Sequence, residues 1–294
     1  MDTPERKALA TLPVVVLIGI GVALAGSHGG VEAGGIPVFA LATATAFVIQ
    51  WLAFVPAYLL RSERFFDLTG GFTYLVAATM STLLNPHAGS RAVLLLVMVG
   101  VWAVRLAGFL FARVHRAGTD ARFDELKQSF IRYLLVWTMQ GLWVTLTLAA
   151  ALAALTSPVR VPLGWPACAG AVIWGMGFII EAAADLQKSR FRSREANRGK
   201  FIRSGLWAWS RHPNYFGEIV LWTGIAIIAL PVLSGWQYVT LISPVFVAVL
   251  LTRISGVPIL EQRADERWGG QADYEAYKAH TPVLIPRPPR NACT

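Results

Sequence analysis

Six stretches of this chain contain no Asp, Glu, Lys or Arg, and each is at least 20 residues long. They are residues 8–27, 33–60, 68–90, 133–159, 161–180 and 219–252. A helix needs roughly 20 apolar residues to cross the hydrocarbon of a bilayer, so every stretch is long enough for a transmembrane helix. The last one is interrupted by Pro231, Ser234 and Gly235, which predicts two helices joined by a turn. Residues 92–112 are also apolar except for Arg105.

These runs predict an all-α fold, a polytopic membrane helix bundle with about eight transmembrane helices. The chain has 294 residues, of which 55% are hydrophobic and only 15% charged, and a soluble domain of this length needs more polar surface. We expect one membrane domain over residues 1–294. The expected helices are 8–27, 37–60, 66–85, 91–112, 133–155, 163–184, 213–231 and 236–254. If the first segment were a cleaved signal peptide, seven would remain.

The net charge of +9 is distributed as expected for a membrane protein, and we expect no nucleic-acid partner. With the N-terminus inside, 23 of the 26 Lys and Arg residues fall in cytosolic segments. Residues 6–7 and 61–64 hold two each, 113–132 five, 188–211 eight and 253–290 six. Only Arg91 and Arg160 lie on the opposite side, and Arg105 lies within the membrane. This bias is the positive-inside pattern and predicts both termini in the cytosol.

Ionisable residues in or beside the apolar helices gather toward the predicted cytosolic side. Together with the polar Asn214 and Tyr215, they are Asp67, Arg105, Glu181, Asp185, Arg211, His212, Glu218 and Glu261. Such groups are costly in a membrane, so each needs a partner or a function. Glu181 and Asp185 are four residues apart and share one helix face. The pattern predicts a polar cavity that opens to the cytosol.

Structural roles remain open for each of these residues. Asp67 could cap the third helix, and Arg105 could reach the interface or pair with a carboxylate. Glu181 and Asp185 could face Lys188 and Arg192 as ordinary ion pairs. The residues Trp207 and Trp209 could belong to an aromatic belt, and the basic segment 188–211 could contact anionic lipid head groups.

Two negative observations limit the kind of site. Cys168 and Cys293 fall on opposite faces of the predicted topology, so no disulfide or metal framework follows from them. The chain has neither the glycine-rich turn of a dinucleotide-binding fold nor a phosphate-binding loop of the Gly-x-x-x-x-Gly-Lys-Ser/Thr type. A nucleotide would therefore have to bind between helices.

Residues 205–218 read Gly-Leu-Trp-Ala-Trp-Ser-Arg-His-Pro-Asn-Tyr-Phe-Gly-Glu. This segment resembles the signature of the membrane steroid 5α-reductase and sterol reductase superfamily, in particular its bacterial DUF1295 branch. Glu181-x-x-x-Asp185-x-Gln-Lys and Phe201 precede it, and Gly256-x-Pro-x-Leu-Glu261 and Asp273-Tyr-x-x-Tyr-x-x-x-Thr-Pro follow it. The resemblance covers residues 60–290 and leaves residues 1–60 as additional N-terminal helices. The Arg-His-Pro-x-Tyr-x-Gly core is shared with membrane methyltransferases that modify isoprenylcysteine or phospholipid.

The resemblance implies NADPH bound in a pocket that faces the cytosol, in a bacterial-type inner membrane. Asp185, Arg192, Asn214 and Glu218 match nucleotide-contacting positions, whereas Glu181 stands where the reductases often have Asn. The further cofactor-binding candidates are Arg116, Arg211, His212, Tyr215 and Glu261.

The catalytic candidates are Asp67, Trp102 and Arg105. The steroid enzymes pair a Glu with a Tyr at the substrate ketone, and Asp67 and Trp102 stand at these two positions. An indole N–H can donate a hydrogen bond but cannot deliver a proton, which puts a steroid substrate in doubt.

The leading hypothesis is an NADPH-dependent reductase of an activated C=C bond in a lipid-soluble enone. We expect a monomer whose substrate enters from the bilayer. One alternative is a methyltransferase that uses S-adenosylmethionine in the same scaffold. Another is a lipid-binding or transport protein without catalytic activity.

Overall fold

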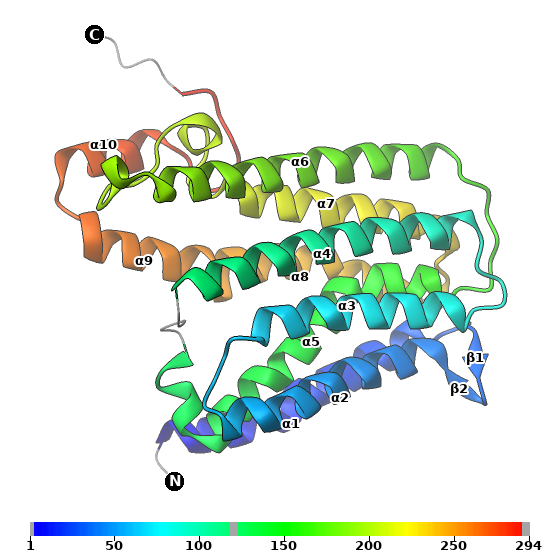
Figure 1. The fold of residues 1–294 in the computed structure, drawn as a ribbon. Helices are drawn as coiled ribbons and strands as arrows, with labels where there is room; N and C mark the ends of the chain where they lie inside the picture. Colours follow the sequence, from blue (N-terminus) through cyan, green and yellow to red (C-terminus); the bar gives the residue numbers. More distant parts are fainter. Residues whose placement is uncertain (1–2, 118–122, 290–294) are drawn as a thin grey trace. The chain divides into compact units, whose positions relative to one another are not determined.

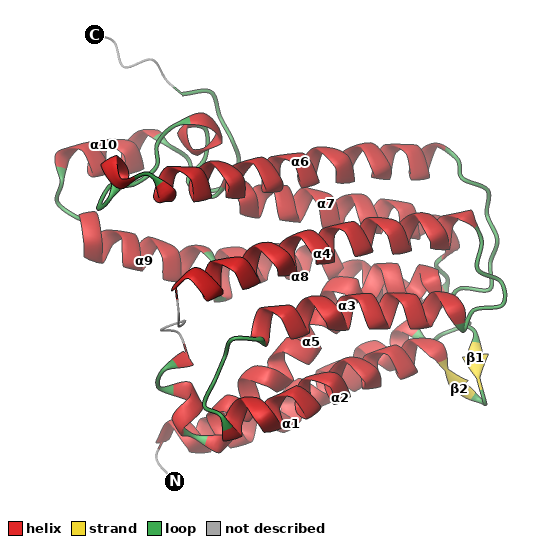
Figure 2. Ribbon diagram, viewed as in Figure 1, coloured by secondary structure: helices red, strands yellow, loops and turns green. Residues whose placement is uncertain are grey.

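The computed structural model describes residues 3–117 and 123–289, without the side chains of residues 113–117. These residues are helical almost throughout (Figures 1 and 2). They form two compact units. Unit 1 consists of Met1–Cys168 and Ala226–Ser243, and unit 2 of Ala169–Ile225 and Pro244–Thr294. The chain therefore leaves each unit and returns to it.

Unit 1 is built around one buried helix. Its elements are α1 (Thr3–Gly26), β1 (Glu32–Ala33), β2 (Ile36–Pro37), α2 (Val38–Leu59), α3 (Phe66–Leu83), α4 (Ser90–Ala117) and α5 (Phe130–Leu155). Helix α5 packs against all four other helices. Of the 18 residues that form its most apolar part, 89% are buried. The side chains of Ala149, Ala150, Ala151 and Ala153, in its last turns, are fully buried. Small residues allow helix backbones to approach closely where no water drives association.

Unit 2 carries the C-terminal helices. They are α6 (Trp165–Ser193), α7 (Pro213–Ala229), α8 (Ile242–Val249), α9 (Val257–Trp268) and α10 (Ala272–His280), and α6, α7 and α8 each continue into unit 1. Helix α6 extends nine residues beyond the predicted end at residue 184. Two short 3₁₀ helices, Glu195–Asn197 and Gly205–Ala208, lie in the basic segment before α7.

Helices α6 and α7 touch through glycines. A Cβ atom on Gly177 would lie 2.5 Å from the backbone of Gly217 and Leu221. A Cβ on Gly217 would lie 2.6 Å from the Glu181 nitrogen, and one on Gly224 would lie 2.5 Å from the Gly170 oxygen. No side chain fits at these positions unless the backbones move apart. This contact brings the C-terminal part of α6 against the first turns of α7.

Among the described residues, seven helical segments are long and apolar enough to cross a membrane. Helix α3 forms where the third span was predicted but is not one of the seven, because its 18 residues include Asp67 and many Thr and Gly residues. Large apolar side chains on the spans are exposed, such as Leu17 (64%) and Leu24 (72%) on α1. Lipid is the solvent that such a surface requires. The chain is a multi-pass helical membrane protein that associates with the lipid bilayer.

The last predicted span, residues 236–254, is not one regular helix. It begins as a 3₁₀ helix, Gly235–Leu241, continues as α8 and ends as the π-helix Leu250–Ile254. Helices α1 and α2 belong to unit 1 together with α3, α4 and α5.

Candidate functional site

The segment before α7 is fixed by hydrogen bonds to α6 and α10. Gly205 has a positive φ of 64°, and a Cβ there would meet the Gln187 side chain, whose Oε1 accepts from the Leu206 N–H at 2.9 Å. The indole of Trp207 is buried and donates to the Ala184 carbonyl at 3.0 Å. The Tyr277 hydroxyl donates to the Trp207 carbonyl at 2.8 Å. Trp207 is therefore an anchor inside unit 2 and not part of an aromatic belt.

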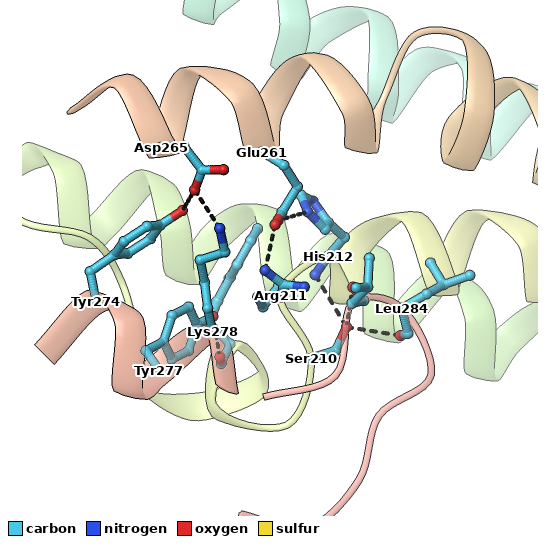
Figure 3. Close-up of polar contacts among 11 residues, drawn as sticks. Ser210, Arg211, His212, Glu261, Asp265, Tyr274, Tyr277, Lys278 and Leu284 are labelled. Carbon is cyan, nitrogen blue, oxygen red and sulfur yellow. Dashed lines mark hydrogen bonds and ion pairs between the residues drawn. The ribbon is translucent and has the colours of Figure 1, made fainter. Parts of the chain in front are cut away.

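The C-terminal segment holds the next residues from the other side. The Ser210 hydroxyl donates to the Leu284 carbonyl at 2.8 Å and accepts from the His212 N–H at 3.1 Å (Figure 3). The Arg211 N–H donates to the Pro282 carbonyl at 2.9 Å. These hydrogen bonds fix the backbone of residues 210–212. The positions from which the Arg211 and His212 side chains project are therefore fixed as well.

Arg211 and His212 both bind Glu261 of α9, and we name these three residues the Arg211–His212–Glu261 cluster. The Nε2 atom of His212 lies 2.7 Å from Oε1 of Glu261, and Nη1 of Arg211 forms an ion pair with Oε2 (Figure 3). The Arg and His side chains are 13% and 5% exposed, and that of Glu261 is 23% exposed. The Tyr215 ring stacks on the His212 ring with centroids 5.6 Å apart.

Burial determines the charge of the His212 ring. Desolvation lowers its pKa below the usual value and outweighs the opposing hydrogen bond to Glu261. The neutral ring donates its Nε2–H to the carboxylate, so Nδ1 carries a lone pair that accepts hydrogen bonds. Within the described residues, neither this buried Nδ1 nor the buried Nε–H of Arg211 has a partner. The cluster thus presents one acceptor and one donor that no described residue satisfies.

A hydrogen bond between Asp185 and Asn214 joins α6 to α7. Glu181 and Asp185 are 2% and 6% exposed, and Oδ1 of Asp185 accepts from the Asn214 side-chain amide at 3.1 Å. The glycine contact at Gly217 makes this meeting possible because it places α7 directly against α6. The two acids are therefore not exposed interface carboxylates.

A further network stabilises α9 against α10. Asp265 accepts hydrogen bonds from the Tyr274 hydroxyl at 2.9 Å and from Lys278 Nζ at 2.6 Å (Figure 3). Burial, followed by the bond to Asp265, raises the pKa of Tyr274 above its usual value, and burial also raises that of Tyr277. Both phenols stay protonated. Sequence reasoning did not select Asp265, although its spacing of four residues from Glu261 places both on one face of α9.

The remaining cofactor candidates are less buried. Tyr215 and Glu218 are half-buried on α7, and Glu218 shares a helix face with Asn214. Arg192 is exposed near the end of α6. Arg116 belongs to α4, but its side chain lies outside the described part of the structure.

The three catalytic candidates lie on α3 and α4 in unit 1, whereas all cofactor candidates except Arg116 belong to unit 2. The N-cap of α3 is Phe65, so Asp67 is not the cap; it lies in the first turn and is half-buried. Arg105 is half-buried and lies 5.8 Å from the centre of the Phe109 ring.

Helices α3 and α4 meet where Gly71 faces Ala107, since a Cβ on Gly71 would lie 2.4 Å from the Ala107 Cβ. One turn farther along, the Tyr74 ring packs edge-on against the buried Trp102 ring, with centroids 5.0 Å apart. Sequence reasoning missed Tyr74, although its spacing of seven residues from Asp67 puts both on one face of α3. We name Asp67, Tyr74, Trp102 and Arg105 the α3–α4 cluster.

Comparison with known proteins identifies the family. A family model described as "Protein of unknown function (DUF1295)" matches residues 53–281. No curated protein and no solved structure matches the chain. The matched range contains every predicted site residue. Because the match covers well over half of the sequence, this chain belongs to the DUF1295 family.

Proposed function

We propose that this protein is a membrane-embedded, NADPH-dependent reductase of an activated C=C bond in a lipid-soluble enone. The observation that carries the proposal is the Arg211–His212–Glu261 cluster, whose buried donor and buried acceptor have no partner in the part of the chain that the structure describes. Buried polar atoms are nearly always satisfied, so two such atoms in one cluster point to a ligand.

The residues of unit 2 fit a dinucleotide phosphate. The segment from Lys188 to Arg211 carries eight Lys and Arg residues, and guanidinium groups bind phosphate through paired N–H donors. His212 Nδ1 can accept from a ribose hydroxyl, and Arg211 Nε can donate to a phosphate oxygen. Asp185 and Asn214, already joined to each other, offer polar groups for a ribose or an amide. When bound, NADPH would supply the hydride.

Glu261 acts on the cofactor site through its neighbours. Its carboxylate accepts the Nε2–H of His212 and thereby fixes the tautomer in which Nδ1 is an acceptor. It also orients the Arg211 guanidinium. Both side chains are positioned before any ligand arrives, which lowers the ordering cost of binding.

The α3–α4 cluster is the proposed substrate-binding part. Reduction of an enone places hydride on the carbon β to the carbonyl, and negative charge grows on the carbonyl oxygen. A hydrogen-bond donor at that oxygen stabilises the charge, and a proton must then reach the α carbon. A phenol can supply both the hydrogen bond and a proton, whereas the indole of Trp102 cannot deliver a proton. We assign the donor role to Tyr74, which contacts Trp102; Asp67 and Arg105 lie on the same two helices, α3 and α4.

The lipid solubility of the substrate is supported by the surface of α3. An apolar groove of about 420 Å³ is lined by Leu75, Val76, Thr79, Met80, Leu83 and Leu84. The groove lies on the same helix as Tyr74, although its lining residues occupy a different face of α3. A long apolar molecule dissolved in the bilayer would lie in this groove. The bias of Lys and Arg supports a cytosolic location for the cofactor site, in a bacterial-type inner membrane.

The proposal is tested by cofactor identity. The full-length protein in neutral detergent is titrated with NADPH, NADH and S-adenosylmethionine by calorimetry, and NADPH oxidation is followed by absorbance with a panel of lipid-soluble enones. We expect NADPH to bind to the protein without an enone, and to be oxidised only when an enone is present. Binding of S-adenosylmethionine without NADPH would reassign the protein to the methyltransferases. If none of the three binds, the proposal fails in favour of a non-catalytic lipid-binding role.

A further inference from the structure

A polar cavity lies in unit 1, where three connections between helices meet. They are the α3–α4 connection, the α5–α6 connection and the turn after α7. The cavity has a volume of about 330 Å³. Its lining includes Asn85, His87, Arg91, Ser157, Arg160 and Val232, and none of its described lining residues is acidic. No residue of this cavity takes part in the proposed reaction.

Arg91 is a buried cation in this cavity. It is 6% exposed, and its guanidinium donates to the carbonyls of Ile228 at 2.6 Å and Pro162 at 3.0 Å. Its Nε–H is buried and has no partner, and no carboxylate among the described residues pairs with it. Carbonyl oxygens satisfy hydrogen bonds but bring no neutralising charge, and a buried charge is normally paired. A role in linking the loops accounts for these carbonyl contacts and for a third, longer one to the Val161 carbonyl at 3.4 Å, and leaves the charge and Nε unexplained.

The start of α4 adds donors to the same wall. Ser90, Arg91 and Ala92 line the cavity, and they form the first turn of a 28-residue helix. N–H groups in a first turn have no partner within the helix, and the helix dipole favours an anion there. The helix terminus and the buried Arg91 thus act in the same direction.

Arg160 contributes a second guanidinium at the exposed side of the cavity. Its Nε donates to the His87 carbonyl at 3.2 Å. Arg91 and Arg160 are also the only two Lys or Arg residues that the predicted topology places outside the membrane on the non-cytosolic side. The two exceptions to the charge bias therefore line one cavity. Separate structural roles for Arg91 and Arg160 would not explain why they lie together.

The cavity walls are held by buried hydrogen bonds. The Asn85 amide donates to the carbonyls of Leu155 at 2.8 Å and Ser157 at 3.0 Å, and the Ser157 hydroxyl donates to the Val232 carbonyl at 3.0 Å. These bonds link the three connections. The donors therefore keep their positions whether or not a ligand is bound, which favours binding.

We propose that this cavity is a binding site for a phosphate-type oxyanion. The group would be held by Arg91, Arg160 and the first-turn N–H groups of α4. Such a group occurs in free inorganic phosphate and in the head groups of anionic phospholipids. Both share the tetrahedral oxyanion that guanidinium groups and a helix N-terminus bind. The site is independent of the proposed reductase activity.

Binding is measured on the full-length protein in two arms. In neutral detergent, inorganic phosphate is titrated at constant ionic strength and thermal unfolding is followed. In phosphatidylcholine nanodiscs, phosphatidylglycerol is added and its retention is measured by native mass spectrometry. The variant Arg160→Gln is compared with Arg64→Gln, which removes an exposed Arg elsewhere in unit 1. A ligand that binds only the folded state stabilises it by RT ln(1 + L/Kd), where L is the free ligand concentration, so the unfolding temperature rises with ligand concentration.

We expect Arg160→Gln to weaken binding about tenfold in at least one arm, and Arg64→Gln to leave it unchanged. A response in the first arm identifies free phosphate as a ligand, and a response only in the second identifies a lipid head group. Ala88→Asp, which adds an acid to the cavity lining, should abolish binding and serves as the second variant if Arg160→Gln does not fold. If the wild type responds in neither arm, or if Arg160→Gln and Ala88→Asp both bind as the wild type does, the proposal is overturned.

Discussion

Nε2 of His212 and Oε1 of Glu261 lie 2.7 Å apart, although 49 residues separate them in the sequence. The contact connects the motif before α7 to α9, and the same carboxylate holds Arg211. It determines which imidazole nitrogen remains free. The prediction on Glu261 depends on this contact directly.

Glu261→Gln should lower both stability and cofactor affinity. The substitution removes the charge that pairs with Arg211 and leaves that buried cation uncompensated, which costs about 2–4 kcal/mol. Thermal unfolding and NADPH calorimetry measure the two effects. Glu266→Gln, at an exposed position on the same helix, should change neither. Equal behaviour of the two variants would show that the Glu261 contacts are dispensable.

Protonation of His212 should destabilise the protein as the pH falls. Burial lowers the pKa of the folded state below the unfolded value of about 6.5. Between these two values the unfolded chain binds more protons, so stability is complete above the unfolded pKa and is lost as the pH falls toward the folded pKa. The slope is at most about 1.4 kcal/mol per pH unit. Unfolding temperatures from pH 8 to pH 5 should fall more steeply for the wild type than for His212→Gln.

Asn214→Ala should weaken NADPH binding about tenfold, since it removes an amide from the proposed cofactor site and leaves buried Asp185 without this donor. Calorimetry measures the change in Kd. Gln262→Ala removes an amide from an exposed position and should bind NADPH as the wild type does. A non-catalytic protein would retain its function in both variants.

Tyr74→Phe tests the proposed proton donor. The ring contact with Trp102 remains possible, whereas the hydroxyl is lost. We expect kcat for enone reduction to fall about 100-fold with little change in NADPH affinity, in the range of a lost acid catalyst. Tyr58→Phe, also in unit 1, should leave kcat unchanged. An unaltered rate in Tyr74→Phe would remove Tyr74 from the mechanism and leave the cofactor assignment standing.

Gly217→Ala should disrupt the packing of α6 and α7. The new methyl group would lie 2.6 Å from backbone atoms of α6, and relief of such overlap costs about 1–3 kcal/mol. Gly175→Ala is the matched control, because a Cβ at this position on α6 meets nothing within 4 Å. Thermal unfolding of the two purified variants in detergent should separate them clearly. Similar unfolding temperatures would show that the contact between α6 and α7 tolerates a side chain at residue 217.

The helical fold was predictable because long apolar runs fix helix existence in a membrane protein. All eight predicted segments are helical, and the acids Glu181 and Asp185 could be placed on one face from their spacing. The hydrogen bond of Asp185 with Asn214 could not be predicted, since it depends on how closely the glycines let α7 approach. Periodicity also failed to show where α6 ends, because its polar last turns lie beyond the apolar run.

The parts of the site that sequence reasoning missed depend on contacts between distant residues. Tyr74 looks like an ordinary residue of an apolar helix until Trp102 packs against it. Arg91 and Arg160 were visible only as exceptions to a charge bias. Their shared cavity arises from the meeting of three loops, which no local pattern encodes.

The division of unit 1 into residues 1–168 and 226–243 also has a consequence for biosynthesis. The Gln237 amide donates to the Gly26 carbonyl, and the Ser243 hydroxyl donates to the Thr147 carbonyl. Helices α1 and α5 are therefore synthesised long before the residues that they bind. A ribosome must release roughly four-fifths of the polypeptide before this half can close. During that interval the insertion machinery or a chaperone has to shield the unfinished surface, and truncations that end before residue 243 should be degraded.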